Sequence, residues 1–387
     1  MTARSLEELA SPYLQGLVPY IPGKPIDEVE RELGITRAIK LASNENPLGP
    51  SPLALRALRD ALSESHRYPD GGGYYLKQGL ARHLGLTSDH LVLGNGCNEL
   101  LELMARCFLL PGDEVVIADP AFVIYGMLAH LHGCTTVRVP LKAWTHDLEA
   151  MAKAVTSKTK MVFVGNPNNP TGTAVRPAEL TGLMDALPDD VIVVIDEAYI
   201  EYVPPEMAPD SLGFVRQGRP VIVLRTFSKI YGLAGLRVGY GMAPPPMVEL
   251  LERVRAPFNV NTLAQRAALA ALDDDAHLSN SRSINELGRA YLSGELQRLG
   301  LECPPSVANF LLIGLKQDGR AVADALLRMG VIVRPLGGAT LKTHIRVTIG
   351  TPPENERFIE ALRTVLGKEQ RSALSDQQPG KELIAEG

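Results

Sequence analysis

A lysine stands among hydroxyl groups directly after a run of residues typical of a buried strand. Residues 221–224 are apolar and mostly β-branched, as in parallel strands that are covered on both faces. The polar and charged residues that follow are Thr226, Ser228, Lys229 and Arg237. Hydroxyls and a guanidinium at the carboxyl end of a strand suit a phosphorylated ligand. A desolvated lysine beside another cation loses its proton more readily than a surface lysine, so Lys229 is a candidate Schiff-base nucleophile.

An aspartate ends another buried-strand pattern. Asp196 follows five apolar residues, 191–195, and it needs a partner there because an unpaired buried charge is costly. It could cap the next helix, as aspartates often do. A protonated pyridine nitrogen is the better match for a carboxylate in this position. Tyr199, three residues further on, could donate a hydrogen bond to an oxygen on the same ring.

Two further loops come directly after predicted strands. Gly94-Asn95-Gly96 follows a strand at 91–93 and precedes a helix, so its N–H groups would face an anion at the start of that helix. This pattern lacks the third glycine of a dinucleotide-binding turn. In the other loop, residues 166–172, two prolines and a glycine leave Asn169 little conformational freedom.

The elements that position these residues alternate between strand and helix patterns from 45 to 265. The apolar runs lie at 91–93, 115–118, 136–139, 161–164, 191–195, 221–224 and 238–242, and amphipathic stretches separate most of them. This alternation predicts an α/β large domain with a mostly parallel seven-stranded sheet flanked by helices. Ligands of such sheets bind at the carboxyl ends of the strands, where all four elements above are expected.

The remaining segments predict three further units. Residues 266–368 read as a smaller α+β domain with one long helical region, strands at 309–313, 331–333 and 344–349, and helices at 319–329 and 353–366. Residues 1–44 are rich in proline, so we expect an arm that contacts the small domain or a second subunit. Residues 369–387 are polar and are predicted to be a disordered tail.

Composition excludes several classes of protein. A net charge of −5 gives no reason to expect nucleic-acid binding. No stretch approaches the length of a membrane span, and the first residues lack the apolar core of a signal peptide, so we expect a cytoplasmic protein. The four cysteines, Cys97, Cys107, Cys134 and Cys303, have no metal-ligand spacing, and we expect reduced thiols and no metal site.

Taken together, the four elements meet the needs of pyridoxal 5'-phosphate. They supply an amine for its carbonyl carbon, a carboxylate for its ring nitrogen, donors for its phenolic oxygen and a group of donors for its phosphate. In the mechanism that follows from these roles, Asp196 keeps the ring nitrogen protonated so that the ring accepts electrons from the substrate Cα–H bond. The amine of Lys229 then moves the proton between Cα and C4′ of the cofactor.

The chain resembles the fold-type I pyridoxal-phosphate aminotransferases, and within them the histidinol-phosphate aminotransferase subfamily. The resemblance covers residues 10–368. The motifs that carry it are Tyr20-Ile-Pro-Gly-Lys-Pro, Leu41-Ala-Ser-Asn-Glu-Asn-Pro-Leu-Gly-Pro-Ser-Pro, Arg67-Tyr-Pro-Asp, Asn168-Asn-Pro-Thr-Gly, Asp196-Glu-Ala-Tyr, Thr226-Phe-Ser-Lys and Ile345-Arg-Val-Thr-Ile-Gly. Residues 337–342 depart from the Gly-Tyr-Gly type of loop expected in many relatives.

The resemblance also assigns roles by position in these motifs. It implies that Lys229, Asp196 and Tyr199 are catalytic. The cofactor-binding residues it implies are Gly96, Cys97, Phe122, Asn169, Asp196, Tyr199, Thr226, Ser228, Lys229 and Arg237, with Tyr68 reaching the phosphate from a neighbouring subunit. The substrate-binding residues it implies are Tyr20, Arg334 and Arg346. Because Tyr68 would complete the other subunit's site, the resemblance also implies a homodimer with shared active sites.

The expected activity is amino transfer between L-histidinol phosphate, whose oxo form is imidazole acetol phosphate, and 2-oxoglutarate in histidine biosynthesis. One guanidinium can bind the phosphate of one substrate and the carboxylate of the other. Three alternatives stay open at this point. They are an aromatic amino acid aminotransferase, a decarboxylase of a phosphorylated amino acid, and a cofactor-sensing module of a regulator. The regulator would need a DNA-binding domain, and the first 44 residues show no basic helix-turn-helix pattern.

Overall fold

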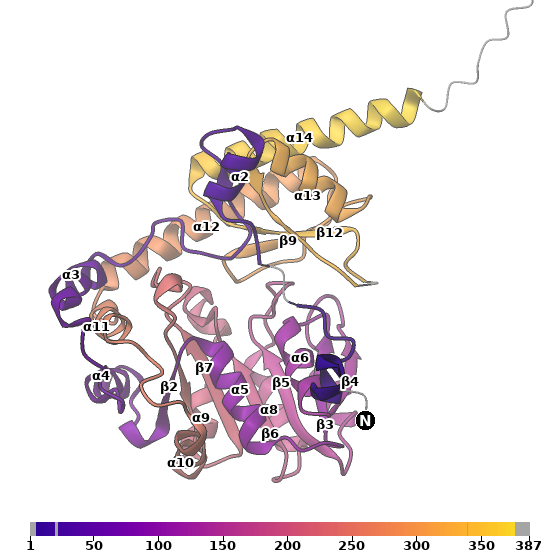
Figure 1. Cartoon of the computed structure of the whole chain (residues 1–387). Coiled ribbons are helices and arrows are strands. Elements are labelled where there is room, and N and C mark those ends of the chain that lie inside the picture. Colours follow the sequence, from indigo (N-terminus) through magenta and orange to yellow (C-terminus); the bar gives the residue numbers. More distant parts are fainter. Residues whose placement is uncertain (1–4, 20–21, 339, 376–387) are drawn as a thin grey trace, which may run out of the picture.

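The computed structural model describes residues 5–19, 22–338 and 340–375. Within these ranges the chain forms a larger part around a wide sheet and a smaller part above it (Figure 1). The long helix α12 (Asp275–Arg298) leads from the larger part into the smaller one.

The larger part is built on a seven-stranded sheet with the strand order β2-β8-β7-β6-β5-β3-β4. Only β8 runs antiparallel to its neighbours, so the predicted mostly parallel sheet is confirmed. The strands are β2 (Leu91–Gly94), β3 (Glu114–Asp119), β4 (Thr135–Pro140), β5 (Thr159–Gly165), β6 (Ile192–Asp196), β7 (Val221–Thr226) and β8 (Gly239–Met242). The strongly apolar central strands are explained by helices that cover both faces.

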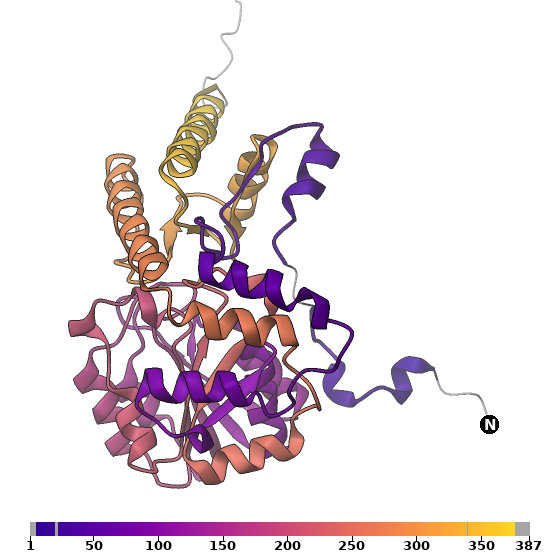
Figure 2. The same cartoon turned by 90° about the vertical axis from the view of Figure 1, so that its left-hand side faces the viewer.

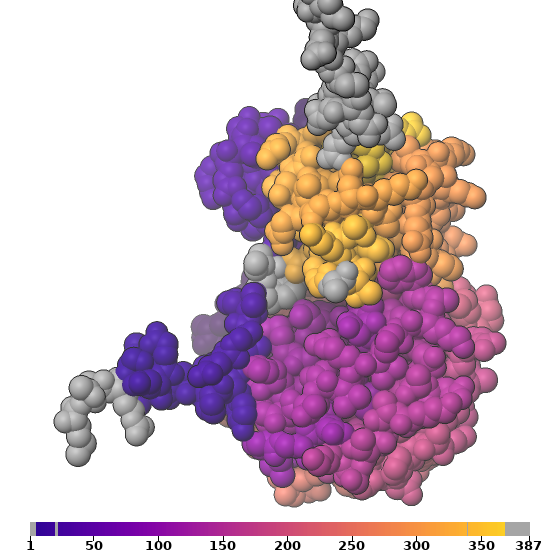
Figure 3. All heavy atoms as spheres, turned by 90° about the vertical axis from the view of Figure 1, so that its right-hand side faces the viewer, coloured from indigo at the N-terminus to yellow at the C-terminus, as the bar shows by residue number. Residues whose placement is uncertain are grey.

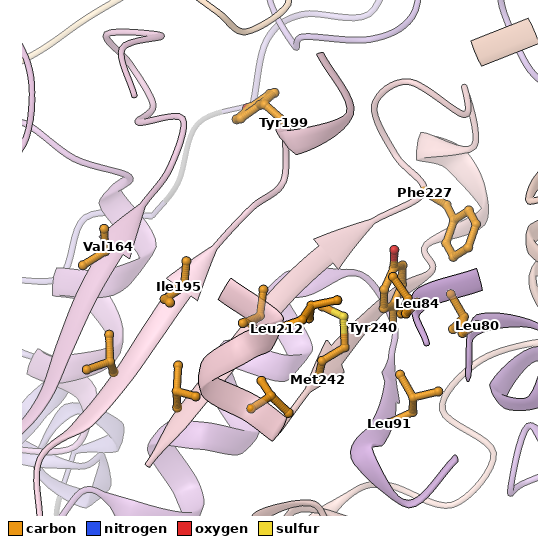
Figure 4. Close-up of a cluster of buried hydrophobic side chains, with 14 of the residues drawn as sticks. Leu80, Leu84, Leu91, Val164, Ile195, Tyr199, Leu212, Phe227, Tyr240 and Met242 are labelled. Carbon is orange, nitrogen blue, oxygen red and sulfur yellow. The ribbon is translucent and has the colours of Figure 1, made fainter. Parts of the chain in front are cut away.

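Successive side chains of the central strands enter two different cores, as the pleat requires. In β6, Ile192 and Val194 pack against one set of helices, whereas Val193 and Ile195 face the other. The first set is α5 (Cys97–Phe108), α6 (Val123–Leu131) and α10 (Pro245–Val254). The second is α4 (Tyr74–Leu84), α7 (Leu148–Lys153), α8 (Pro177–Ala186), α9 (Ser211–Arg216) and α11 (Thr262–Ala271). Figure 4 shows part of the second core, with Tyr199 beyond the end of β6.

The smaller part has its own sheet and core. Its antiparallel sheet has the order β11-β12-β9, formed by β9 (Phe310–Gly314), β11 (Arg334–Pro335) and β12 (His344–Thr348). The helices α12, α13 (Gly319–Arg328) and α14 (Pro352–Ser375) pack against it. A separate parallel pair joins β10 (Val331–Ile332) to β1 (Ile39–Lys40), so the N-terminal segment, with α2 (Ile26–Leu33), packs on this part.

The remaining elements lie along the outside of the molecule. The helix α3 (Pro52–Ala61) packs beside α11 (Figure 2), and α1 (Leu6–Leu9) lies on a segment that extends away from the larger part (Figure 3). The single 3-10 turns are Pro12–Leu14, Leu62–Glu64, Ser88–His90, Ile200–Tyr202, Pro205–Met207 and Ala234–Leu236.

Two helix predictions need correction. The single helical region expected after residue 265 is two helices, since α11 ends at Ala271 and Asp274 caps α12 by accepting the N–H of His277 at 3.2 Å. The helix expected to end at 366 continues to Ser375, so residues 369–375 of the predicted tail are helical, and residues 376–387 lie outside the described part of the chain. The division into an arm, a large domain and a small domain stays a prediction.

Candidate active site

Lys229 lies just beyond the carboxyl end of β7, next to the N-terminal segment of the chain. Its Nζ donates to the backbone carbonyl of Ser43 at 3.2 Å and lies 5.5 Å from the centroid of the Tyr199 ring. The ammonium of Lys229 is also close enough to Asp196 to affect the pKa of that carboxyl. The structure therefore brings together the three residues predicted to be catalytic, from the ends of β6 and β7.

Asp196 is the last residue of β6, and its carboxylate faces α6. Its Oδ2 accepts the hydroxyl proton of Tyr125 at 2.8 Å, and its Oδ1 accepts the N–H of Ala198 at 3.1 Å. Burial raises the pKa of Asp196, while these two hydrogen bonds and the charge of Lys229 oppose the rise. The carboxylate sits where a cation or a protonated ring nitrogen would relieve its desolvation.

Tyr199 is held by a residue from the other end of the chain. Nδ2 of Asn44 donates to the Tyr199 hydroxyl at 3.0 Å, and the Tyr199 ring packs edge-on against Phe310 at 5.1 Å between centroids. Burial raises the pKa of Tyr199, so the phenol is neutral and keeps a proton to donate. Asn44 itself is fixed because its N–H donates to Oγ1 of Thr348 at 2.8 Å.

Arg346 connects the smaller part to the loop that carries Asn169. Its Nη1 donates to Oδ1 of Asn169 at 2.6 Å and its Nη2 to the carbonyl of Ala42 at 2.8 Å. The guanidinium also lies 5.3 Å above the ring of Phe310. These contacts fix the plane of the guanidinium, which favours recognition of a carboxylate or phosphate over a loosely held charge.

A second group of donors gathers at the N-terminus of α5. Oγ1 of Thr226 donates to Oγ of Ser228 at 3.0 Å, and Nη1 of Arg237 donates to the same Ser228 oxygen at 3.4 Å. Gly96 starts the helix with φ +77°, and no side chain caps the first turn. A Cβ at Gly96 would lie 2.3 Å from Nη2 of Arg237, so only glycine lets the guanidinium lie against the helix start.

Cys97 occupies the first position of α5, beside this donor group. Its thiol donates to the carbonyl of Arg225 at 3.3 Å, and burial raises its pKa well above the usual range, so the thiol is neutral. The backbone of Cys97 is therefore the part that can face an anion. Together with Gly96, Thr226, Ser228 and Arg237 it forms a site of N–H, hydroxyl and guanidinium donors, which suits a phosphate group.

The remaining predicted residues lie around this centre or apart from it. Phe122 precedes α6 and packs edge-on against Tyr125 at 5.6 Å, whereas Arg334 lies on β11 directly opposite Arg346 in the sheet register. Tyr68 is 84% exposed, stacks on Phe258 at 4.8 Å, and forms no hydrogen bond to the other site residues within the described chain. Tyr20 and residue 339 of the departing loop lie outside the described residues.

Sequence reasoning missed two partners in this site. Tyr125 lies three residues after Phe122 and so on the same face of α6, a spacing that could have identified it. Asn44 lies within the motif that starts at Leu41, but its contact with Tyr199 joins residues 155 positions apart, and no local pattern reveals it.

The described residues contain neither a metal-binding cluster nor a membrane-spanning helix. No group of three or more histidine, cysteine or acidic side chains in the described chain is arranged to hold a metal ion. No helix in the same part of the chain is long and apolar enough to cross a membrane.

Comparison with known families supports the same conclusion as the geometry. Residues 36–362 match the model of the family "Aminotransferase class I and II", which covers most of the chain. The chain belongs to the class I and II aminotransferases. It is similar to the histidinol-phosphate aminotransferase of Moorella thermoacetica, with 53% identity over 349 residues, or 90% of each chain.

Solved aminotransferase structures share the fold. A histidinol-phosphate aminotransferase from Sinorhizobium meliloti, in complex with pyridoxal-5'-phosphate, superimposes with a TM-score of 0.88 at 30% identity, covering 95% of this chain and 99% of that one. A double mutant of the aspartate aminotransferase of Thermus thermophilus gives 0.79 at 26% identity, covering 94% and 100%. Since aminotransferases of different named substrates share this fold, the fold alone does not select the substrate.

Proposed function

We propose that this class I and II aminotransferase moves an amino group between L-histidinol phosphate and 2-oxoglutarate, with pyridoxal 5'-phosphate as cofactor, in histidine biosynthesis. The observation that carries the substrate assignment is the similarity, over nearly the whole of both chains, to a histidinol-phosphate aminotransferase. The fixed guanidinium of Arg346 supports it, because both partner substrates bring an anionic group.

The residues present fit the cofactor. Thr226, Ser228, Arg237 and the start of α5 offer donors for its phosphate, and the Gly96 backbone leaves room for the guanidinium beside them. The buried Asp196 carboxylate would pair with the ring nitrogen, and Asn169 and Tyr199 would donate to the ring oxygen. Phe122 would stack on the ring, and Lys229 would hold the cofactor's carbonyl carbon covalently. Bound pyridoxal phosphate supplies an electron sink and a carrier for the amino group.

The chain's own groups then do the proton chemistry. The Lys229 amine would move the proton between the substrate Cα and C4′ of the cofactor. The Tyr125 hydroxyl and the Ala198 N–H both donate to Asp196 and favour its ionised form, against the burial that raises its pKa, so a positively charged partner there is favourable. Tyr199 is held in place by Asn44, so its hydroxyl keeps a fixed direction during the proton transfers.

Arg346 would bind the anionic end of either substrate. Asn169 and Ala42 each engage one terminal nitrogen of this guanidinium, so it is preorganised before substrate arrives. Arg334, opposite it on β11, would lie near the distal end of the substrate. Tyr20, proposed for the same end, belongs to the part of the chain that the structure does not describe.

The proposal includes a homodimer with shared active sites. The larger part exposes aromatic side chains that a subunit interface would bury. Their exposed fractions are 84% for Tyr68, 64% for Tyr75 and 46% for Phe258. The N-terminal segment adds Leu6 and Leu9, which are 82% and 64% exposed. In such a dimer, the partner's Tyr68 would reach the cofactor phosphate. A cytoplasmic location is part of the same proposal.

A product assay tests the reaction. The holoenzyme is incubated with L-histidinol phosphate and 2-oxoglutarate, and glutamate and carbon dioxide are both measured. We expect one glutamate for each histidinol phosphate consumed and no carbon dioxide, and Lys229→Ala should abolish turnover while the cofactor still binds noncovalently. Carbon dioxide without glutamate would identify a decarboxylase, and full activity of the Lys229→Ala variant would remove that residue from its role.

A further inference from the structure

A buried ion pair lies directly behind the proposed site and takes no part in the chemistry above. Nε of Arg225 donates to Oε2 of Glu197 at 2.8 Å, and the side chains are 17% and 0% exposed. Glu197 follows Asp196 in sequence, and Arg225 precedes Thr226. Each member of the pair is therefore the chain neighbour of a residue proposed to hold one end of the cofactor.

The pleat of the sheet separates the pair from the site. Ile195 and Val223 face the core that contains α4, α9 and α11, whereas Val194 and Leu224 face the core of α5 and α6. Continuing this alternation puts Asp196 and Thr226 on the α5 and α6 side, where Asp196 meets Tyr125. Glu197 and Arg225 fall on the opposite side, where they meet each other. The site and the ion pair thus lie on opposite faces of the sheet, at the ends of the same two strands.

The ion pair continues the connection between β6 and β7 where the backbone ladder stops. The last Cα pair of the two strands is Asp196 with Leu224, and the last backbone bond runs from the N–H of Glu197 to the carbonyl of Leu224 at 2.8 Å. Beyond it the chain leaves β6, whereas β7 continues to Thr226 beside β8. The Glu197–Arg225 side chains form the next link, and the carbonyl of Arg225 also accepts the thiol of Cys97 at the start of α5.

The surroundings of the pair make it sensitive to change. Oε1 of Glu197 and Oε2 of Glu201 are buried and have no hydrogen-bond partner among the described residues. The charge of Arg225 acts on both carboxylates, that of Arg282 also acts on Glu201, and Tyr240 lies opposite Arg225 on β8. Removal of one member alone would leave the other as an uncompensated buried charge, which is strongly unfavourable.

We infer that Glu197 and Arg225 are a positioning pair, which fixes the separation between Asp196 and Thr226 and so between the groups that hold the two ends of the cofactor. The inference rests on the proposed function, because it takes the cofactor as the ligand. It requires no contact of either residue with the cofactor or the substrate. It predicts that losing the pair loosens the cofactor and slows the reaction even when the chain folds normally.

The test uses holoenzyme of the double variant Glu197→Gln/Arg225→Met, which removes both charges of the pair together. The control is Glu295→Gln, which removes a buried carboxylate paired with Arg298 and Arg363 in the smaller part. Four quantities are measured on each: the thermal unfolding midpoint, the rate at which pyridoxal phosphate is lost on dialysis, and kcat and KM for the amino donor. A merely structural pair would alter only the first.

In the double variant we expect the cofactor to be lost about a hundredfold faster on dialysis and kcat to fall about a hundredfold. A fall of this size is what misplacing the reacting groups by about 1 Å costs, and KM should change far less. The single variant Arg225→Lys should retain more of the cofactor and a higher kcat than the double variant, because it keeps the positive charge. Glu295→Gln should lower the unfolding midpoint and leave cofactor loss and kcat within about twofold of the wild type.

Two results overturn the inference alone. One is a double variant that retains cofactor and kcat like the wild type, and the other is a Glu295→Gln variant that loses them equally. A wild-type chain that takes up no pyridoxal phosphate contradicts the proposed function and the inference together, and the dialysis measurement identifies that case before any turnover is measured.

Discussion

The hydroxyl of Tyr125 donates to Oδ2 of Asp196 across 2.8 Å, and this bond joins α6 to the end of β6. Both groups are buried, and the bond favours the ionised carboxylate against the desolvation that raises the pKa of Asp196. The Tyr125 ring also stacks on Phe163 at 5.0 Å and meets Phe122 edge-on, so the hydroxyl is rigidly placed. The charge state of the proposed ring-nitrogen partner therefore depends on a tyrosine one helical turn after the proposed stacking residue.

Tyr125→Phe should shift the pH dependence of the reaction. The variant keeps the ring but removes the donor, so the pKa of Asp196 should rise and the acidic limb of the kcat profile should move to higher pH. We expect kcat at the optimum to fall about tenfold, equivalent to about 1.4 kcal/mol for a hydrogen bond to a charged group. Tyr202→Phe removes another buried phenol and should leave the limb in place. An unmoved limb in Tyr125→Phe would show that the bond does not control Asp196.

Gly96→Ala should weaken cofactor binding through a clash with Arg237. The new Cβ would lie 2.3 Å from Nη2 of that guanidinium, in a backbone with φ +77°. Gly218→Ala is the matched control, because its φ is +72° and nothing lies within 4 Å of the added carbon. Both variants should lose about 1 kcal/mol of stability from backbone strain. Only Gly96→Ala should release the cofactor faster on dialysis, and equal release from both would exclude the clash as the cause.

Arg346→Lys should impair both half-reactions. Lysine keeps the charge but cannot contact Asn169, Ala42 and a substrate anion at once, so kcat/KM should fall about a hundredfold for histidinol phosphate and for glutamate alike. Arg328→Lys, at an exposed position on α13, should change neither value. A loss confined to one of the two substrates would mean that their anionic groups bind at different places.

Glu201→Gln should change how stability depends on pH. Burial raises the pKa of Glu201 from 4.5 to about 7, with the charge of Arg225 opposing the rise. Between these values the folded chain holds a proton that the unfolded chain has released, so this group's contribution to stability is complete below pH 4.5 and is lost as the pH rises through about 7.

The glutamine variant should lack that loss. The difference in its free energy of unfolding between pH 5 and pH 7.5 should be smaller than in the wild type by no more than about 3 kcal/mol. Denaturant unfolding at the two pH values measures it. The same slope in both proteins would mean that Glu201 is already ionised in the folded chain at pH 5.

Local sequence patterns predicted the parts of the site that lie on single strands. The apolar run before Asp196 and the one before Thr226 place both residues at strand ends, because a buried parallel strand must end where polar residues begin. The contacts that orient these residues come from distant segments. Asn44 reaches Tyr199, Ala42 reaches Arg346, and Ser43 reaches Lys229, all through a stretch whose own sequence indicates only a loop.

The misjudged helix ends have a similar physical origin. Asp274 reads in sequence as one polar residue of a helical pattern, and only the bond from the His277 N–H identifies it as a cap. The continuation of α14 to Ser375 follows a polar sequence without an apolar face that a periodicity search would detect.

The most direct test mixes the yellow holoenzyme with one amino donor at a time and no acceptor. L-histidinol phosphate, L-phenylalanine and L-tyrosine are each added, and the loss of the visible absorbance of the bound cofactor is followed. Fast loss with histidinol phosphate alone is the result that the proposed function predicts. Comparable loss with phenylalanine or tyrosine would contradict it and identify a broader aromatic aminotransferase, with the loop at 337–342 as the first place to look for the cause.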